Sequence, residues 1–271
     1  MSVTDPGHPL LADFVALGDP AVRRRVEREG GYFVVEGILA IERLLSVPGW
    51  TIRSFALLPR IADRLGPLIE AAAPAVPVAV ADEDVLRAVV GFDIHRGALA
   101  SVERQAPAPA ADLVAAARHA GGLLLAVEGV NDHENLGALY RNAAAFGVAG
   151  VLLDPTSADP FYRRSVRVSL GHVLAVPTAE LAPLPAGLAE LHALGATTIA
   201  LTPGGDLALG DLDRARLPPG PLVLLVGAEG SGLTDATLAA ADHRVAIPMA
   251  TGVDSLNVAT AAAIALHHLR R

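Results

Sequence analysis

Leu222-Val-Leu-Leu-Val-Gly-Ala-Glu-Gly-Ser-Gly-Leu233 is the stretch that most restricts the range of possible folds for this chain. Its apolar run ends in a glycine-rich turn, which is typical of a strand covered on both faces and followed by a loop. Glycine lets a loop backbone approach a ligand closely, and Glu229 adds a carboxylate that accepts hydrogen bonds. The glycine order is the reverse of the dinucleotide-binding fingerprint, so the loop does not indicate that function. Such turns also occur in α/β proteins without binding a ligand.

Two further polar segments also follow apolar runs. The first is Asn135-Leu-Gly-Ala-Leu-Tyr-Arg141, which comes after the run 123–127. The second begins with Ile247-Pro-Met249 at the end of the run 244–247 and leads on to Ser255-Leu-Asn257. In a parallel sheet the carboxyl ends of the strands meet at one edge, where ligands bind. We therefore expect one site built from three distant loops.

A structural interpretation of the same residues stays open. Asn135 and Asn257 each stand at the start of an expected helix, where asparagine is a common N-cap. Arg141 lies nearly two turns further along an alanine-rich helix that we expect to be mostly buried. A cap does not explain this arginine, because a buried guanidinium requires an anion or a carboxylate partner.

The rest of the chain predicts an α/β protein with two domains. Short apolar runs alternate with helical patterns, which indicates a parallel sheet in the C-terminal part. The expected strands there are 123–127, 150–153, 197–201, 222–226 and 244–247. The expected divisions are an N-terminal extension (1–19), a smaller α/β domain (20–104), a linker with alternating prolines (105–111) and the parallel-sheet domain (112–271).

Composition excludes several classes of protein. The 271 residues include no cysteine, which removes disulfides, thiolate metal sites and cysteine nucleophiles. All 21 basic residues are arginine, so a phosphate-binding loop that needs lysine cannot form. Apolar runs are too short to span a membrane and residues 1–20 do not resemble a signal peptide, so we expect a cytoplasmic protein without membrane contact.

Charge restricts how nucleic acid could bind. The net charge of −8 disfavours nonspecific binding to phosphates, but two arginine clusters interrupt the acidic background. They are Arg23, Arg24, Arg25 and Arg28, and Arg163, Arg164 and Arg167. By itself each cluster is also compatible with a solvated helix face.

Taken in order and spacing, the three segments resemble the motifs of the SPOUT class of RNA methyltransferases, in its TrmH-like (SpoU) branch, which methylates ribose 2′-hydroxyls. The resemblance covers Leu123 to Leu269. The first block, with Tyr32-Phe-Val-Val-Glu36-Gly37, resembles the small ribosomal-protein-like α/β domain of many members that act on rRNA. It implies S-adenosylmethionine as cofactor, RNA as substrate with ribosomal RNA favoured over transfer RNA, a C-terminal domain with a deep trefoil knot, and a homodimer formed through that domain.

The resemblance also implies roles for individual residues, with no metal among them. Catalytic positions are Asn135, Arg141, Glu229, Ser255 and Asn257; cofactor-binding positions are Gly227, Ile247 and Leu256; RNA-binding positions are Arg23, Arg24, Arg163, Arg164 and Arg167.

Arginine could act as a base only after its guanidinium had lost a proton, which is costly. We therefore hypothesise that charged Arg141 grips a phosphate and stabilises negative charge on the 2′-oxygen. Glu229 would position the arginine or the nucleotide, while the other polar residues fix geometry. Two alternatives remain: methylation of a base atom, and an RNA-binding member of the fold that has lost catalysis.

Overall fold

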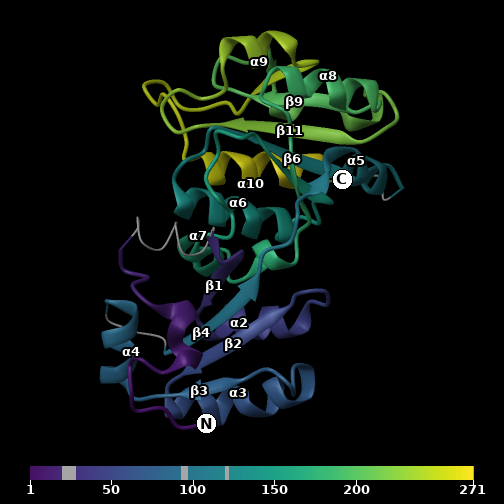
Figure 1. The fold of residues 1–271 in the computed structure, drawn as a ribbon. Helices are drawn as coiled ribbons and strands as arrows, with labels where there is room; N and C mark the ends of the chain where they lie inside the picture. Colours follow the sequence, from purple (N-terminus) through teal and green to yellow (C-terminus); the bar gives the residue numbers. More distant parts are fainter. Residues whose placement is uncertain (20–28, 93–96, 120–121, 271) are drawn as a thin grey trace. The chain divides into compact units, whose positions relative to one another are not determined.

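The computed structural model describes residues 1–19, 29–92, 97–119 and 122–270. Contacts divide the chain into two compact units (Figure 1). The N-terminal unit comprises Met1–Ala106 and Phe161–Ala175, and the C-terminal unit comprises Pro107–Pro160 and Val176–Arg271. The chain therefore passes between the units three times, and a segment from the middle of the expected 112–271 domain packs within the N-terminal unit.

The described part of the N-terminal unit contains a mixed four-stranded sheet. Its order is β1 (Tyr32–Glu36), β4 (Ala98–Glu103), β2 (Ile52–Leu57) and β3 (Val78–Val80). β4 is antiparallel to both of its neighbours, whereas β2 and β3 are parallel. The associated helices are α2 (Ile38–Ser46), α3 (Pro59–Ala72) and α4 (Glu83–Val90). The apolar runs thus predicted this α/β block.

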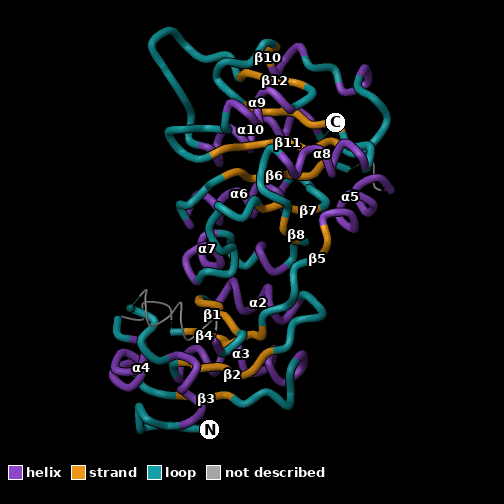
Figure 2. The backbone as a smooth tube through the Cα atoms, turned by 45° about the horizontal axis from the view of Figure 1, so that its top comes forward, coloured by secondary structure: helices purple, strands orange, loops and turns teal. Residues whose placement is uncertain are grey.

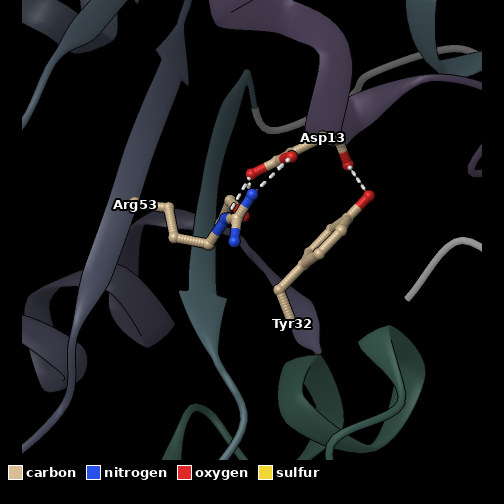
Figure 3. A network of polar contacts seen from close by, with 4 residues as sticks. Asp13, Tyr32 and Arg53 are labelled. Carbon is tan, nitrogen blue, oxygen red and sulfur yellow. Dashed lines mark hydrogen bonds and ion pairs between the residues drawn. The ribbon is translucent and has the colours of Figure 1, made fainter. Parts of the chain in front are cut away.

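The first residues of the chain pack onto this sheet. A 3-10 helix, η1 (Pro9–Phe14), buries Leu11 and Phe14 completely. Figure 3 shows how Asp13 secures it: Arg53 donates from Nε to Oδ2 at 2.8 Å, and the Tyr32 hydroxyl donates to the Asp13 carbonyl at 3.1 Å. The expected extension therefore contributes to the core of the unit.

Phe161–Ala175 is held in the N-terminal unit by aromatic and ionic contacts. Phe161 packs against Phe33 and Trp50, with ring centroids 4.8 and 5.5 Å away. The segment continues as α7 (Arg163–Val168) and the 3-10 helix η2 (His172–Leu174). Arg163 donates to the buried Glu36 carboxylate at 2.8 Å and lies over the Phe92 ring.

The C-terminal unit is built on a parallel sheet of eight strands within the described residues. Its order is β10 (Leu207–Ala208), β12 (His243–Ala246), β9 (Thr197–Leu201), β11 (Leu222–Gly227), β6 (Leu123–Glu128), β7 (Gly150–Leu153), β8 (Thr178–Glu180) and β5 (Ala108–Pro109). The five expected strands are present within one residue at each end. The edge strands β5 and β10, and β8 next to β5, were not expected, because runs of two or three residues show no periodicity.

Helices fill the connections between these strands and follow the last strand (Figure 2). They are α5 (Ala110–His119), α6 (His133–Ala145), α8 (Ala186–Ala193), α9 (Asp235–Ala240) and α10 (Val258–Leu269), with 3-10 helices η3 (Leu209–Asp211) and η4 (Arg214–Arg216). α10 packs against α6 and against β11. Its alanines allow this close approach, since Ala259, Ala262 and Ala265 are all buried. In the described residues, no helix is long and apolar enough to cross a bilayer.

We predict that the Glu36–Arg163 ion pair anchors the Phe161–Ala175 segment in the N-terminal unit. Replacing Glu36 by alanine leaves a mostly buried guanidinium without its carboxylate, and should lower the free energy of unfolding by about 3 kcal/mol. Trp50 is the single tryptophan of the chain and lies in this unit, so urea unfolding followed by its fluorescence reports the effect.

The matched control is Glu42→Ala, which removes the carboxylate of the more exposed Glu42–Arg64 pair. This change should cost under about 1 kcal/mol. Equal losses in the two variants would contradict an anchoring role for Glu36.

Candidate functional site

The three polar segments follow β6, β11 and β12 at their carboxyl ends. Side chains from all three meet in one chain of hydrogen bonds. The Asn257 amide donates from Nδ2 to Asn135 Oδ1 at 2.8 Å, and Asn135 Nδ2 donates to Glu229 Oε1 at 2.5 Å. We call these three residues the amide relay. The three distant loops therefore meet at these residues, as expected, and their role as one functional site stays a prediction.

The direction of the amide relay is set at its two ends. Glu229 is a carboxylate and can only accept, so Asn135 must present its NH₂ group to it. At the other end, Asn257 Oδ1 accepts from the backbone N–H groups of Ala259 and Thr260 at 3.0 and 3.2 Å. Only the NH₂ group of Asn257 then remains for Asn135.

The capping interpretation holds for one asparagine and is wrong for the other. Asn257 is the N-cap of α10 and serves the amide relay as well. α6 is capped by Asp132, whose Oδ1 accepts from the N–H groups of Glu134 and Asn135. Because Asp132 satisfies these donors, the side chain of Asn135 is available for Glu229 and Asn257.

Arg141 lies differently from expectation. The residue is exposed rather than buried on α6, and the described part of the chain shows no hydrogen-bond or ion-pair partner for it. Glu229, its hypothesised carboxylate, binds Asn135 instead. An exposed arginine without a partner among the described residues can receive an anion from outside.

Tyr140, beside it, belongs to the core. Its hydroxyl is 2.7 Å from Thr178 Oγ1, and its side chain is fully buried. Burial raises the pKa of Tyr140, so the phenol stays protonated at neutral pH and does not supply a base.

The glycine-rich loop folds back tightly on its own start. A Cβ at Gly227 would lie 2.2 Å from the backbone of Gly232, so only glycine fits there. The Gly232 N–H donates to the Ala228 carbonyl at 2.8 Å, and Gly230 has a φ of +89°. Strand and loop thus form a closed hairpin whose tip presents Glu229.

This hairpin forms one wall of a pocket of about 690 Å³. Other lining residues come from residues 254–258 and from the residues that follow β9. Gly227, Leu256, Glu229, Ser255 and Asn257 all line it, as the sequence predicted for one site. Ile247, Arg141 and Asn135 are not among the lining residues. The cofactor-binding and catalytic roles of all the expected site residues stay predictions.

The pocket has an acidic lining. Glu229, Asp235 and Asp254 contribute carboxylates, and none of the residues that line it is basic. Such a lining favours a ligand with net positive charge. Sequence reasoning missed Asp235 and Asp254, because a single Asp in a loop or at a helix start is a common surface residue.

None of the expected RNA-binding arginines that the structure describes lines this pocket. Arg163 is bound to Glu36, Arg167 has a guanidinium nitrogen 3.7 Å from the same carboxylate, and Arg164 is exposed. Arg23 and Arg24 lie outside the described residues. RNA contact by these arginines stays a prediction.

Comparison with known proteins identifies the family to which the C-terminal part of the chain is similar. Residues 122–267 match the model of the SpoU rRNA Methylase family. Relatives from Mycobacterium bovis and Mycobacterium tuberculosis, both named uncharacterized tRNA/rRNA methyltransferase, are 40% identical over 269 residues, which cover 99% of this chain and 91% of each relative.

Solved structures resemble the whole chain. A crystal structure of an AdoMet-bound rRNA methyltransferase from Sinorhizobium meliloti is 28% identical with a TM-score of 0.81, covering 100% of this chain and 97% of that one. The SpoU methyltransferase AviRb from Streptomyces viridochromogenes, in complex with AdoMet, is 25% identical with a TM-score of 0.80, covering 97% and 98%. With the motifs meeting at one site and the family model matching more than half of its length, this chain belongs to the SpoU family of RNA methyltransferases.

Proposed function

We propose that the protein transfers a methyl group from S-adenosylmethionine to a ribose 2′-hydroxyl of RNA, with ribosomal RNA in the cytoplasm as the favoured substrate. The observation that carries the proposal is the double role of Glu229. It lines the acidic pocket, and it also ends the amide relay that brings the three segments together. A donor in the pocket would therefore lie beside the polar groups that orient an acceptor.

The pocket suits this donor in size and charge. Its volume of about 690 Å³ lies within the usual range for small-molecule sites. S-adenosylmethionine carries a sulfonium and an ammonium against one carboxylate, so its net charge is positive. Glu229, Asp235 and Asp254 favour such a ligand, while Gly227 and Leu256 offer backbone and apolar contacts. Ile247 would contribute from the start of the loop that leads to Ser255.

When bound, S-adenosylmethionine supplies an electrophilic methyl group, and the protein's task is to align an oxygen with it. Asn135 and Asn257 hold fixed orientations through the amide relay, and Ser255 adds a hydroxyl at the pocket. The guanidinium of Arg141 would bind the phosphate next to the acceptor ribose and stabilise the negative charge that develops on the 2′-oxygen as its proton passes to solvent.

The choice of a ribose oxygen over a base atom rests on chemistry and on resemblance. Without cysteine, the chain cannot form the thiol adduct that pyrimidine C5 methylation commonly requires. One similar solved structure, 26% identical with a TM-score of 0.74, is named RNA 2′-O ribose methyltransferase. Methylation at another base atom is the remaining alternative.

The finer architecture of the family completes the proposal. β11 lies between β6 and β9, and the segment after β12 leads back to α10, which packs on α6. This path suits a trefoil knot, and a crystal structure traced through residues 247–257 would test the threading.

Ile264 on α10 and Arg141 on α6 are both exposed, which suits a homodimer contact through these helices. The N-terminal unit then serves RNA binding, with Arg164 as its exposed contact.

Transfer itself is tested with labelled donor. The protein is incubated with methyl-labelled S-adenosylmethionine and separate pools of unmethylated ribosomal and transfer RNA, which are then digested to nucleosides. Label should appear in a 2′-O-methylnucleoside, mainly from the ribosomal pool. Label confined to base-methylated nucleosides, or none in either pool, would contradict the proposal.

Arg141→Lys tests the phosphate grip. Lysine keeps the charge but loses the two-pronged geometry, so kcat should fall by about 10- to 100-fold with the melting temperature unchanged. Arg216→Lys is the matched control, since Arg216 is an exposed arginine of the same unit outside the site. Near-normal turnover by the Arg141 variant would rule out the bidentate grip.

Mixing inactive variants shows which subunit Arg141 serves. Glu229→Ala and Arg141→Ala proteins are unfolded, refolded together and assayed. If Arg141 acts in the partner's pocket, mixed dimers contain one intact site and recover activity. If it acts within its own chain, the mixture stays inactive.

A further inference from the structure

Glu128 is a buried carboxylate next to the pocket, with no role in the proposed transfer. It is the last residue of β6 and is only 6% exposed. In the sheet it stands in register with Gly227, where the glycine-rich hairpin begins. A buried carboxylate is costly unless its oxygens accept hydrogen bonds, so its partners indicate what it does.

Among the described residues, its hydrogen-bond partners all lie just beyond the other end of the hairpin. Oε2 accepts from the Thr234 N–H at 3.0 Å. Oε1 accepts from the hydroxyls of Thr234 and Thr237 at 3.0 and 2.8 Å. Thr234 also caps α9, since its hydroxyl accepts from the Thr237 N–H. We call Glu128, Thr234 and Thr237 the threonine clamp.

The threonine clamp closes the base of the hairpin from both sides. The backbone of Glu128 pairs beside Gly227 at the start, and its side chain holds Thr234 immediately after Leu233 at the end. The residues between them, from Gly227 to Leu233, line the pocket and include Glu229. Asp235 and Leu238 of α9 line it too. Any shift at Thr234 would therefore move a whole wall of the pocket.

We propose that Glu128 is a positioning residue for donor binding: through Thr234 and Thr237 it sets the hairpin and the start of α9 at the spacing that S-adenosylmethionine requires. Glu128 does not itself line the pocket. The inference rests on the proposed function, because it assigns the affinity for the donor to a contact outside the pocket.

Thr237→Val tests the clamp, because valine keeps the shape of threonine and removes one donor to Glu128. The chain offers a closely matched control in Thr198→Val. Both threonines are fully buried, and both hydroxyls donate to a carboxylate at 2.8 Å, in Thr198 to Asp242. Thr198 stands near the start of β9, while the pocket lies beyond its end at Leu201.

Calorimetric titration with S-adenosylmethionine should show a dissociation constant about fivefold higher for Thr237→Val, and less than about twofold higher for Thr198→Val. Both variants should show a lowered melting temperature. Equal affinities in the two variants at similar losses of melting temperature would overturn the positioning role and leave the clamp purely structural.

Glu128→Gln and Glu128→Ala provide a second comparison if Thr237→Val does not fold. Glutamine keeps one accepting oxygen for the Thr234 N–H, whereas alanine keeps none. Affinity should fall in the order wild type, Glu128→Gln, Glu128→Ala, and unchanged affinity in both folded variants would overturn the proposal. Wild-type protein that binds no S-adenosylmethionine would instead contradict the proposed function.

Discussion

Asn135 can satisfy Glu229 and Asn257 together in only one orientation of its amide, and this constraint organises the site. The carboxylate at one end accepts only, and the N-terminus of α10 at the other end donates only. The hydrogen bonds are exposed, so each contributes about 1 kcal/mol or less to folding. Their main effect is geometric: three loops from distant parts of the sequence are held in one arrangement beside the pocket.

Other polar contacts hold in place the helix and the hairpin whose side chains the amide relay connects. Asp132 caps α6 and so leaves the Asn135 side chain available, while the threonine clamp fixes the base of the hairpin that carries Glu229. In the N-terminal unit, the Glu36–Arg163 pair is mostly buried and holds a segment from the middle of the chain. An arginine cluster that suggests RNA binding in the sequence therefore also includes a structural anchor.

The sequence predicted what depends on local patterns. Runs of apolar residues located the central strands, and glycine with polar residues at strand ends located the loops that meet beside the pocket. It did not predict which unit takes Phe161–Ala175, because that depends on Phe33, Trp50 and Glu36, far away in the chain. Burial of Arg141 was inferred from the alanines around it, but the exposed side of α6 cannot be identified without knowing what packs there. Edge strands of two residues leave no pattern to recognise.

Reversing the direction of the hydrogen bonds in the amide relay tests its role most directly. Asn257→Asp keeps the cap of α10 and adds a carboxylate to the pocket, but it removes the donor to Asn135. Because the arrangement of the three loops depends on that donor, its loss should outweigh the added charge, and affinity for S-adenosylmethionine should fall about fivefold. Adding Glu229→Gln supplies a donor at the opposite end, and Asn135 can then turn over and donate to Asp at position 257. The account predicts that the double variant binds the donor better than Asn257→Asp alone. Affinity equal to or below that of the single variant would contradict it.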